Sequence, residues 1–527
     1  MKIFKLIICL ILLTTTAIKA QKKKSTKPNI ILIYADDMGR GMLSNYGQKY
    51  FTTPNIDRLA DQGMRFNHVY GCNFCAPARA SLISGMHDAH LQPWSFTQGG
   101  VYMKPANEIN VAELSKKIDK VSIPAGENEV FLATVAKNEG YVTAEFGKLE
   151  WGFATSPERI KSHDWDYHFG YYDHRRCHGF YPPFLFENGN LIEIPGNTHV
   201  DCGVTFSRES PENYKKRWDM TGKEKYSEYV FMEKALKFID ENNPKITNKP
   251  FFMYYSSQLP HGPVSVPEVD AELKNNPDLT EIEKEFGTMV KILDNSVGKL
   301  YNHLDKLGLL ENTIIIFTGD NGHEVPTLQT GRTEDGKRML NGGKFDNVKT
   351  KFYSDINGDV FDGNNGMAGL KRASWEGGVR VPLYWFWKGK IAAGTESNQL
   401  VANYDILNTL SELIGGKNYH EKDSKSYSKT LLGSKSDERD YTVFSSKTGP
   451  GIVTKEGWKL RYENKKKVFQ LYYLPKDYRE ENVLNEKYPN KVKELKAILL
   501  KECDGDLDNG GYPTFSFAVP STKEKKH

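Results

Sequence analysis

The sequence has little excess charge, and beyond its first residues it has no long apolar run. Its 71 lysines and arginines nearly balance 67 aspartates and glutamates, which leaves a net charge of +4 over 527 residues. So small an excess gives no reason to expect a nucleic-acid partner, because such proteins carry strongly basic surfaces. No segment after residue 20 reaches the roughly eighteen apolar residues in a row that a membrane-spanning helix needs. We therefore expect no nucleic-acid binding and no membrane span.

Residues 1–20 hold the one long apolar run, and they have the pattern of a secretory signal peptide. Lys2 and Lys5 flank the start of the run, and small residues precede Gln21. The run is too short for a membrane span and ends in a cleavage-like sequence. We expect a signal peptide at 1–20, a basic leader at 21–28, and an exported protein, periplasmic or secreted.

The length of the chain favours two units of unequal size, because a single hydrophobic core stops growing below this length. Continuous apolar runs alternate with helical patterns, and the runs lie at 29–37, 141–148, 250–261, 312–321 and 379–389. Continuous apolar strands separated by helices indicate a sheet covered on both faces. We predict an α/β fold for 29–425, with a large, mixed, mostly parallel sheet sandwiched by helices.

Residues 426–527 have a different pattern. Short strand-like pieces, "YTVFSS", "WKLRYE" and "VFQLYYL", are followed by the helical stretch "NKVKELKAILLKE". This order predicts a smaller C-terminal subdomain in which an antiparallel sheet packs against a helix.

Polar residues stand just past the carboxyl ends of four predicted strands. They are Asp36, Asp37, Lys148, His261, Asp320 and Asn321. Ordinary loop polarity explains one or two of them, but hardly all six from four distant segments. Ligands bind at this edge of open α/β sheets, so the pattern predicts a functional site.

Four of these residues form a ligand set made only of oxygen. Asp36 and Asp37 follow one strand, and Asp320 and Asn321 follow another. Paired aspartates also cap helices and turns, but a second acid–amide pair favours a metal. Hard oxygen ligands select Ca²⁺ or Mg²⁺ over zinc.

The stretch "YGCNFCAPARASLISGMHDAH" contains Cys72 and Cys75 in C-x-x-C spacing. A redox pair would place this motif at the start of a helix in a thioredoxin-like unit, and nothing else in the sequence supports that. A structural zinc would need further ligands, and the other cysteines after the signal peptide are scattered. Pro77 and Arg79 follow the second cysteine at once and favour a third interpretation.

Taken together, these motifs resemble the sulfatases of the alkaline-phosphatase-like superfamily. "CAPARASLISG" fits the signature C-x-P-x-R followed by L-x-T-G, with Ala78 in place of the frequent serine and Ser84 in place of the threonine. Further blocks occur in family order, namely "ADDMGRG", "TTPNIDRLADQGMRF", "FTGDNG", "GLKRASWEGGVRVP" and "LYYLPKDYREENVL". The resemblance covers most of the chain and implies an alkaline-phosphatase-like fold.

The resemblance implies that Cys75 is converted to formylglycine (3-oxoalanine) by a formylglycine-generating or sulfatase-maturating enzyme, with Pro77 and Arg79 as recognition elements. The hydrated aldehyde carries two hydroxyl groups on one carbon. One of them, held by the metal, attacks sulfur, and the other then expels sulfate and restores the aldehyde. A thiol or a serine could attack once but would lack that exit.

The resemblance also implies a role for each residue of the site. One Ca²⁺ would be held by Asp36, Asp37, Asp320, Asn321 and the modified Cys75. Arg79 would hold the hydrated aldehyde, and Lys148, His261 and Lys371 would bind the sulfate. His261 or Lys371 could also protonate the leaving oxygen.

One position departs from the family pattern. The usual block reads G-K-x-H-x-G, and its histidine helps remove the proton that lets sulfate leave. Here the block reads "GKLEWG", with Glu150 at that position. A carboxylate can act as a general base, so we predict this role for Glu150. Substrate binding by Glu150, or slow turnover, are the alternatives.

Two polar stretches, from Asp166 to Gly189 and from His323 to Gly366, should lie near the mouth of the pocket. Their aromatic, Arg and His side chains, with His323 among them, suit a sulfated sugar, although packed loop aromatics explain them equally well. We predict a calcium-dependent sulfatase that acts on sulfated polysaccharide or oligosaccharide. The alternatives are a phosphonate monoester or phosphodiester hydrolase of the same superfamily, and a catalytically silent protein that binds sulfated glycans.

Overall fold

The computed structural model describes residues 27–90, 95–126, 128–198, 210–325, 351–508 and 515–516. The expected signal peptide and most of the expected leader lie outside these ranges. Among the described residues, no helix combines the length and the apolar composition that crossing a membrane requires.

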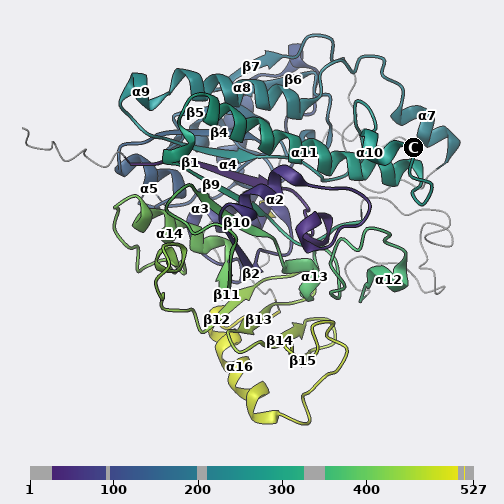
Figure 1. The fold of residues 1–527 in the computed structure, drawn as a ribbon, viewed down its shortest axis with the longest axis vertical. Helices are drawn as coiled ribbons and strands as arrows, with labels where there is room; N and C mark the ends of the chain where they lie inside the picture. Colours follow the sequence, from purple (N-terminus) through teal and green to yellow (C-terminus); the bar gives the residue numbers. More distant parts are fainter. Residues whose placement is uncertain are drawn as a thin grey trace, which may run out of the picture.

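A ten-stranded mixed sheet forms the centre of the large domain (Figure 1). Its strands lie in the order β11-β2-β10-β9-β1-β8-β4-β5-β6-β7. Their bounds are β1 Asn29–Ala35, β2 Met64–Tyr70, β4 Val142–Gly147, β5 Tyr167–Gly170, β6 Phe184–Glu187, β7 Asn190–Glu193, β8 Phe251–Ser256, β9 Thr313–Gly319, β10 Leu383–Trp387 and β11 Thr395–Ala402. Pairing is parallel from β9 to β5 and between β2 and β11, and antiparallel on both sides of β10 and from β5 to β7. The predicted mixed, mostly parallel sheet is confirmed.

Both faces of this sheet are buried, as strand β1 illustrates. Ile31 and Ile33 belong to one hydrophobic core, whereas Ile30 and Leu32 belong to a second. Because successive side chains of a strand point to opposite faces, a continuous apolar run is suited to burial on both. The first core includes residues of α2 (Pro54–Asp61), α8 (Ser227–Glu241) and α11 (Glu281–Lys306). The second includes residues of α3 (Cys75–Ser84), α4 (Val111–Val121), α5 (Leu132–Asn138) and α14 (Ile406–Leu413).

The other helices of the described part of the chain before residue 440 are short. They are α6 Pro157–Ser162, α7 Pro211–Arg217, α9 Pro244–Thr247, α10 Ala271–Lys274, α12 Ser354–Asn357, α13 Glu376–Val379 and α15 Ser428–Leu431. A separate two-stranded parallel sheet joins β3 (Phe96–Thr97) to β16 (Phe515–Ser516).

A smaller unit near the C-terminus lies below the large domain in Figure 1. Four antiparallel strands form its sheet, in the order β12 (Tyr441–Phe444), β13 (Gly451–Thr454), β14 (Trp458–Glu463) and β15 (Val468–Tyr473). Leu495 and Leu499 of α16 (Pro489–Glu502) share a hydrophobic core with this sheet. This matches the predicted architecture, while the domain boundary after residue 425 stays a prediction.

Strands β9, β1, β8 and β4 are neighbours in the sheet and run parallel. Their carboxyl ends therefore meet at one edge. That edge carries the polar residues predicted to form the site.

Candidate active site

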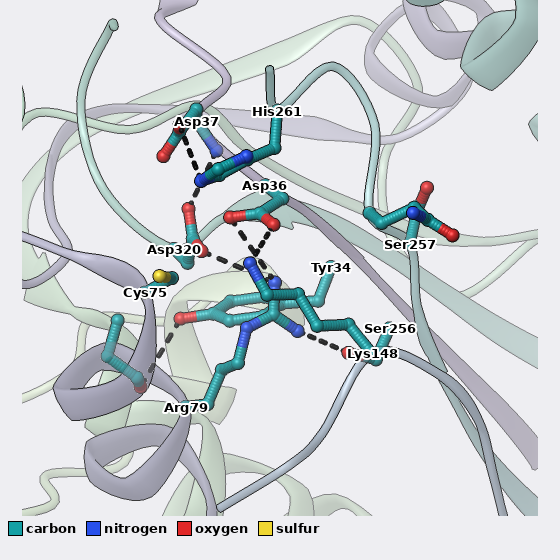
Figure 2. Close-up of polar contacts among 12 residues, drawn as sticks. Tyr34, Asp36, Asp37, Cys75, Arg79, Lys148, Ser256, Ser257, His261 and Asp320 are labelled. Atoms are coloured by element: carbon teal, nitrogen blue, oxygen red, sulfur yellow. Dashed lines mark hydrogen bonds and ion pairs between the residues drawn. The ribbon is translucent and has the colours of Figure 1, made fainter. Parts of the chain in front are cut away.

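The acids that follow β1 and β9 lie against each other at the carboxyl edge of the sheet (Figure 2). The Asp37 N–H donates to Asp320 Oδ1 at 3.0 Å. Asn321 Nδ2 donates to Asp37 Oδ1 at 2.9 Å. Asp37 has a left-handed backbone (φ 63°), which aspartate tolerates better than most residues. This turn just after a strand allows consecutive side chains, those of Asp36 and Asp37, to reach the same site.

This group of residues fits a hard divalent cation. One carboxylate oxygen each from Asp36, Asp37 and Asp320 lies within 4.8 Å of the others, and all three residues are buried. Among the described residues, nothing donates a hydrogen bond to Asp36 Oδ1, Asp37 Oδ2 or Asn321 Oδ1. Buried acceptors without donors are costly, and an oxygen-bound cation such as Ca²⁺ would satisfy them. Burial foremost, and then the charge of Asp36, raise the pKa of Asp320 well above its usual range, and a bound cation would oppose both effects.

Three basic side chains surround the same carboxylates. Lys148 forms an ion pair with Asp36, Lys371 Nζ lies 2.6 Å from Asp37 Oδ1, and His261 Nε2 lies 3.4 Å from Asp37 Oδ2. Burial alone would raise the pKa of Asp36, but nearby basic groups, Lys148 foremost and Arg79 and Lys371 among them, hold it well below its usual range. Burial lowers the pKa of His261 to about 4, so its ring is neutral near neutral pH.

Cys75 is the first residue of α3, and its buried side chain faces this group. Its Sγ lies within 4.8 Å of ligand atoms of both Asp36 and His261. Arg79 lies one turn along the same helix, where residues four apart share a face. Its Nη2 is 3.3 Å from Asp320 Oδ2, and it also contacts Ser256. Cys72 and Cys75 are both buried free thiols, so the C-x-x-C motif is not a disulfide here.

A residue that the sequence did not single out, His174, lies against the cysteine. His174 Nε2 is 3.5 Å from Cys75 Sγ. Its ring packs edge-on against Phe153 and His178, with centroids 4.7 and 4.9 Å away, and His178 stacks on His261 at 4.4 Å. Burial, helped by the charge of Lys148, lowers the pKa of His174 well below its usual range. The only signal in the sequence was the density of His and Arg between Asp166 and Gly189.

The chain matches a known protein family over most of its length. The family model described as "Sulfatase" matches residues 28–416. The chain belongs to the sulfatase family.

Among curated relatives, an N-acetylgalactosamine-6-sulfatase of Rattus norvegicus is 30% identical over 391 residues, which cover 74% of this chain and 62% of that protein. The chain thus spans about three fifths of the length of that relative. An N-acetylgalactosamine-6-O-sulfatase of Bacteroides thetaiotaomicron is 27% identical over 552 residues and covers 93% of this chain and 96% of that protein. A solved structure from work on glycosaminoglycan metabolism by the same species has a TM-score of 0.65 and 23% identity, over 91% of this chain and 100% of that chain, and shows the shared fold.

Glu150, predicted from the sequence as a general base, is directed away from Cys75. Its Oε1 is 2.8 Å from His163 Nδ1, and the side chain is buried. The His163 ring in turn packs against Phe131 and Trp151, with centroids 4.2 and 5.3 Å away. The base role of Glu150 therefore stays a prediction, and it is His174 Nε2 that lies 3.5 Å from Cys75 Sγ.

His323 also lies inside the protein. Only 1% of its surface is exposed, and its Nε2 is 3.1 Å from Asp359 Oδ2. Its carbonyl accepts a hydrogen bond from the Lys371 N–H at 2.8 Å, which helps to position the backbone at Lys371. These contacts favour a packing role, and substrate binding by His323 stays a prediction. Residues 326–350 of the same polar stretch lie outside the described residues.

Proposed function

We propose that this protein hydrolyses sulfate esters on sulfated polysaccharide or oligosaccharide. The observation that carries the proposal is the position of Cys75. It opens α3 between an all-oxygen group of carboxylates and the side chains of Lys148, His261 and Lys371. Transfer of a sulfuryl group requires neutralisation of charge on its oxygens and a nucleophile in line, as phosphoryl transfer does.

The proposal includes two groups that the sulfatase family implies. Cys75 would be matured to formylglycine by a formylglycine-generating or sulfatase-maturating enzyme, and one Ca²⁺ would be held by Asp36, Asp37, Asp320 and Asn321 together with the modified Cys75. When present, formylglycine supplies a hydrated aldehyde as nucleophile, and calcium supplies positive charge beside it. The buried oxygens of Asp36, Asp37 and Asn321 that accept no hydrogen bond from the described residues support this assignment of the cation.

The side chains of this chain would do the rest. Arg79, which reaches Asp320 and stacks over Tyr34, would orient residue 75. Lys148 and Lys371 would hold sulfate oxygens once a cation takes over their carboxylate partners. Lys371 would donate a proton to the leaving oxygen, and the neutral ring of His261 would hold the sulfate through its N–H. His174 Nε2 would accept a proton from residue 75.

The names of the relatives narrow the substrate to be tested first. The rat and Bacteroides thetaiotaomicron relatives are both named for the 6-sulfate of N-acetylgalactosamine. We propose a 6-O-sulfated amino sugar as the first candidate. The signal-like residues 1–20 support export to the periplasm or beyond.

The test is a substrate panel with protein matured by a formylglycine-generating enzyme in the presence of Ca²⁺. The panel holds 6-O- and 4-O-sulfated N-acetylgalactosamine, 6-O-sulfated glucosamine, an aryl sulfate, an aryl phosphodiester and a phosphonate monoester. Cys75→Ala is the inactive variant, and Cys72→Ala is its matched control. Faster hydrolysis of the phosphodiester than of any sulfated sugar would favour the phosphodiesterase alternative. Glycan binding without turnover by protein that keeps an intact Cys75 in its own host would favour the silent binding protein.

A further inference from the structure

A cavity lies at the junction of the large domain and the C-terminal unit, where residues of β2, α13 and β13 line a common space (Figure 1). Its volume is about 660 Å³, within the range of pockets that hold small ligands. None of the residues that line it belongs to the site around Cys75 described above. The cavity is therefore a second candidate binding site.

Arg40, on the wall of this cavity, carries a charge that the described residues leave without a carboxylate partner. Its Nε donates to Asn365 Oδ1 at 3.1 Å, and its Nη1 donates to the Asn67 carbonyl at 3.4 Å. Burial foremost, and then the charge of Arg380, lower the pKa of Arg40 to about 10, so the side chain is still charged at neutral pH. An anion in the cavity would relieve the repulsion between these two guanidinium groups.

The charges next to Arg40 do not cancel its own. Arg380 Nη1 lies 2.8 Å from Glu376 Oε2, and Lys459 Nζ lies 2.9 Å from Glu376 Oε1. Lys459 Nζ has a second partner, Glu480 Oε1 at 3.0 Å. The three cations thus face only two carboxylates, which leaves one positive charge for a ligand.

Three buried N–H donors of residues that line the cavity have no acceptor among the described residues. They are Arg65 Nε, Arg380 Nε and Asn45 Nδ2. Buried donors are normally paired, and each one left unpaired lowers stability. A ligand rich in oxygen atoms would bring acceptors to this wall.

The wall also carries acceptors and an exposed aromatic ring, and this combination favours a saccharide over a simple anion. The carboxylates of Glu396 and Glu456 line the cavity. They would repel a bare polyanion, but they can accept hydrogen bonds from sugar hydroxyls. Tyr478 lines the cavity with 47% of its surface exposed, so its ring is open to packing against the apolar face of a sugar.

Short segments join this cavity to the catalytic centre. Tyr70 lines the cavity, and Cys75 follows five residues later, so their Cα atoms are at most about 18 Å apart. Arg40 likewise follows Asp37 by three residues. An oligosaccharide of several sugar units can span such a separation.

We propose that this cavity is a second binding site for the glycan substrate, and that it holds an acidic sugar unit while another unit of the same chain enters the catalytic site. Arg40 would receive the carboxylate or sulfate of that sugar, and Tyr478 would pack against its ring. The identity of the glycan rests on the proposed function, whereas binding of an acidic saccharide can be measured without it.

Binding to the full-length Cys75→Ala protein, loaded with Ca²⁺, tests the proposal in the absence of hydrolysis. Three hexasaccharides are titrated by calorimetry. A hyaluronan hexasaccharide carries carboxylates only, a sulfated galactan hexasaccharide carries sulfates only, and a chitin hexasaccharide carries neither. We expect saturable binding of at least one acidic hexasaccharide, and binding of the neutral one that is weaker by about tenfold or more.

Variants locate the site. Arg40→Gln should weaken binding of the acidic hexasaccharide about 10–100-fold, because hydrogen bonds to a charged group are lost, and Tyr478→Ala should weaken it severalfold. Arg58→Gln and Tyr229→Ala are the matched controls and should leave the affinity unchanged. Arg58 also lies over a tyrosine ring, that of Tyr301 at 4.9 Å, and Tyr229 is 42% exposed, but neither lines the cavity. Circular dichroism confirms that each variant is folded.

Three results would overturn the proposal. The first is no saturable binding of either acidic hexasaccharide, and the second is equal affinity for the neutral one. The third is binding that stays unchanged in both folded variants, Arg40→Gln and Tyr478→Ala, which would place the saccharide elsewhere. Loss of hyaluronan binding alone in Arg40→Gln assigns the cavity to a carboxylate, and loss of galactan binding alone assigns it to a sulfate.

The substrate panel with matured protein keeps this inference separate from the proposed function. Matured Arg40→Gln should hydrolyse an aryl sulfate at the wild-type rate, because the cavity lies outside the catalytic site. Protein that hydrolyses small sulfated sugars but fails the binding test retains the proposed function and loses the second site. Protein that binds acidic hexasaccharides through Arg40 but hydrolyses no sulfate ester retains the second site and loses the proposed function.

Discussion

Replacing His174 with alanine should lower the steady-state turnover of the matured enzyme by about 10²–10⁴-fold, the usual contribution of a general base. This corresponds to about 3–5 kcal/mol of transition-state stabilisation. His174 Nε2 lies 3.5 Å from Cys75 Sγ, and with 6% of the residue exposed, water can replace the ring only poorly. The assay compares the first-turnover burst with the steady-state rate on an aryl sulfate. If His174 is the base for the step that expels sulfate, its loss should preserve the first-turnover burst and abolish steady-state turnover.

Two further variants separate His174 from its neighbours. His178→Ala removes an imidazole that stacks on His261 at 4.4 Å, and it should cost less than His174→Ala. Glu150→Gln keeps a side chain that can bond to His163, and it should retain turnover within about tenfold of wild type if His174 is the base. A hundredfold loss in Glu150→Gln, together with near-normal turnover in His174→Ala, would refute this reasoning and assign the base to Glu150.

Other predictions concern the metal, the sulfate site and the response to acid. Removal of Ca²⁺ should abolish turnover and lower the Tm, because the buried oxygens of Asp36 and Asp37 lose their cation; an unchanged Tm would argue against the site. Lys371→Met should reduce kcat/KM about 10²–10³-fold, as loss of one charge-stabilising donor does, and unchanged kinetics would remove it from the sulfate site. Burial lowers the pKa of His168 to about 3, so below about pH 6.5 the unfolded chain binds a proton that the folded protein excludes. The free energy of unfolding contributed by the neutral His168 is therefore present above that pH and lost as pH falls, by about 2–3 kcal/mol between pH 7.5 and 4.5. Urea unfolding of His168→Gln at both pH values should show a correspondingly smaller loss.

Local pattern in the sequence determined much of the architecture. Strands β1, β4, β8 and β9 were visible as continuous apolar runs, because each is buried on both faces. The spacing of apolar residues likewise predicted α11 and α16. The strand-end acids could be placed together from the strand pattern alone, because parallel neighbours carry their carboxyl ends to one edge.

Strands with mixed composition were not predicted. β2, with the sequence MRFNHVY, alternates polar and apolar side chains and pairs with β10 and β11 from the other end of the domain. β13 is only four residues long and is held between β12 and β14. In both cases the hydrogen bonds that define the strand come from residues distant in the sequence, so the local pattern is weak.

The sequence by itself determined the fold class and the set of residues at the strand ends, because these depend on periodicity and on motifs within a few residues. Only the tertiary structure decided which imidazole meets Cys75. His174 is 99 positions away along the chain, whereas Glu150, in the position that the motif indicates, turns to His163 instead. The direction of a side chain is set by the packing around it, here by Phe131 and Trp151 beside His163, and no spacing rule contains that information.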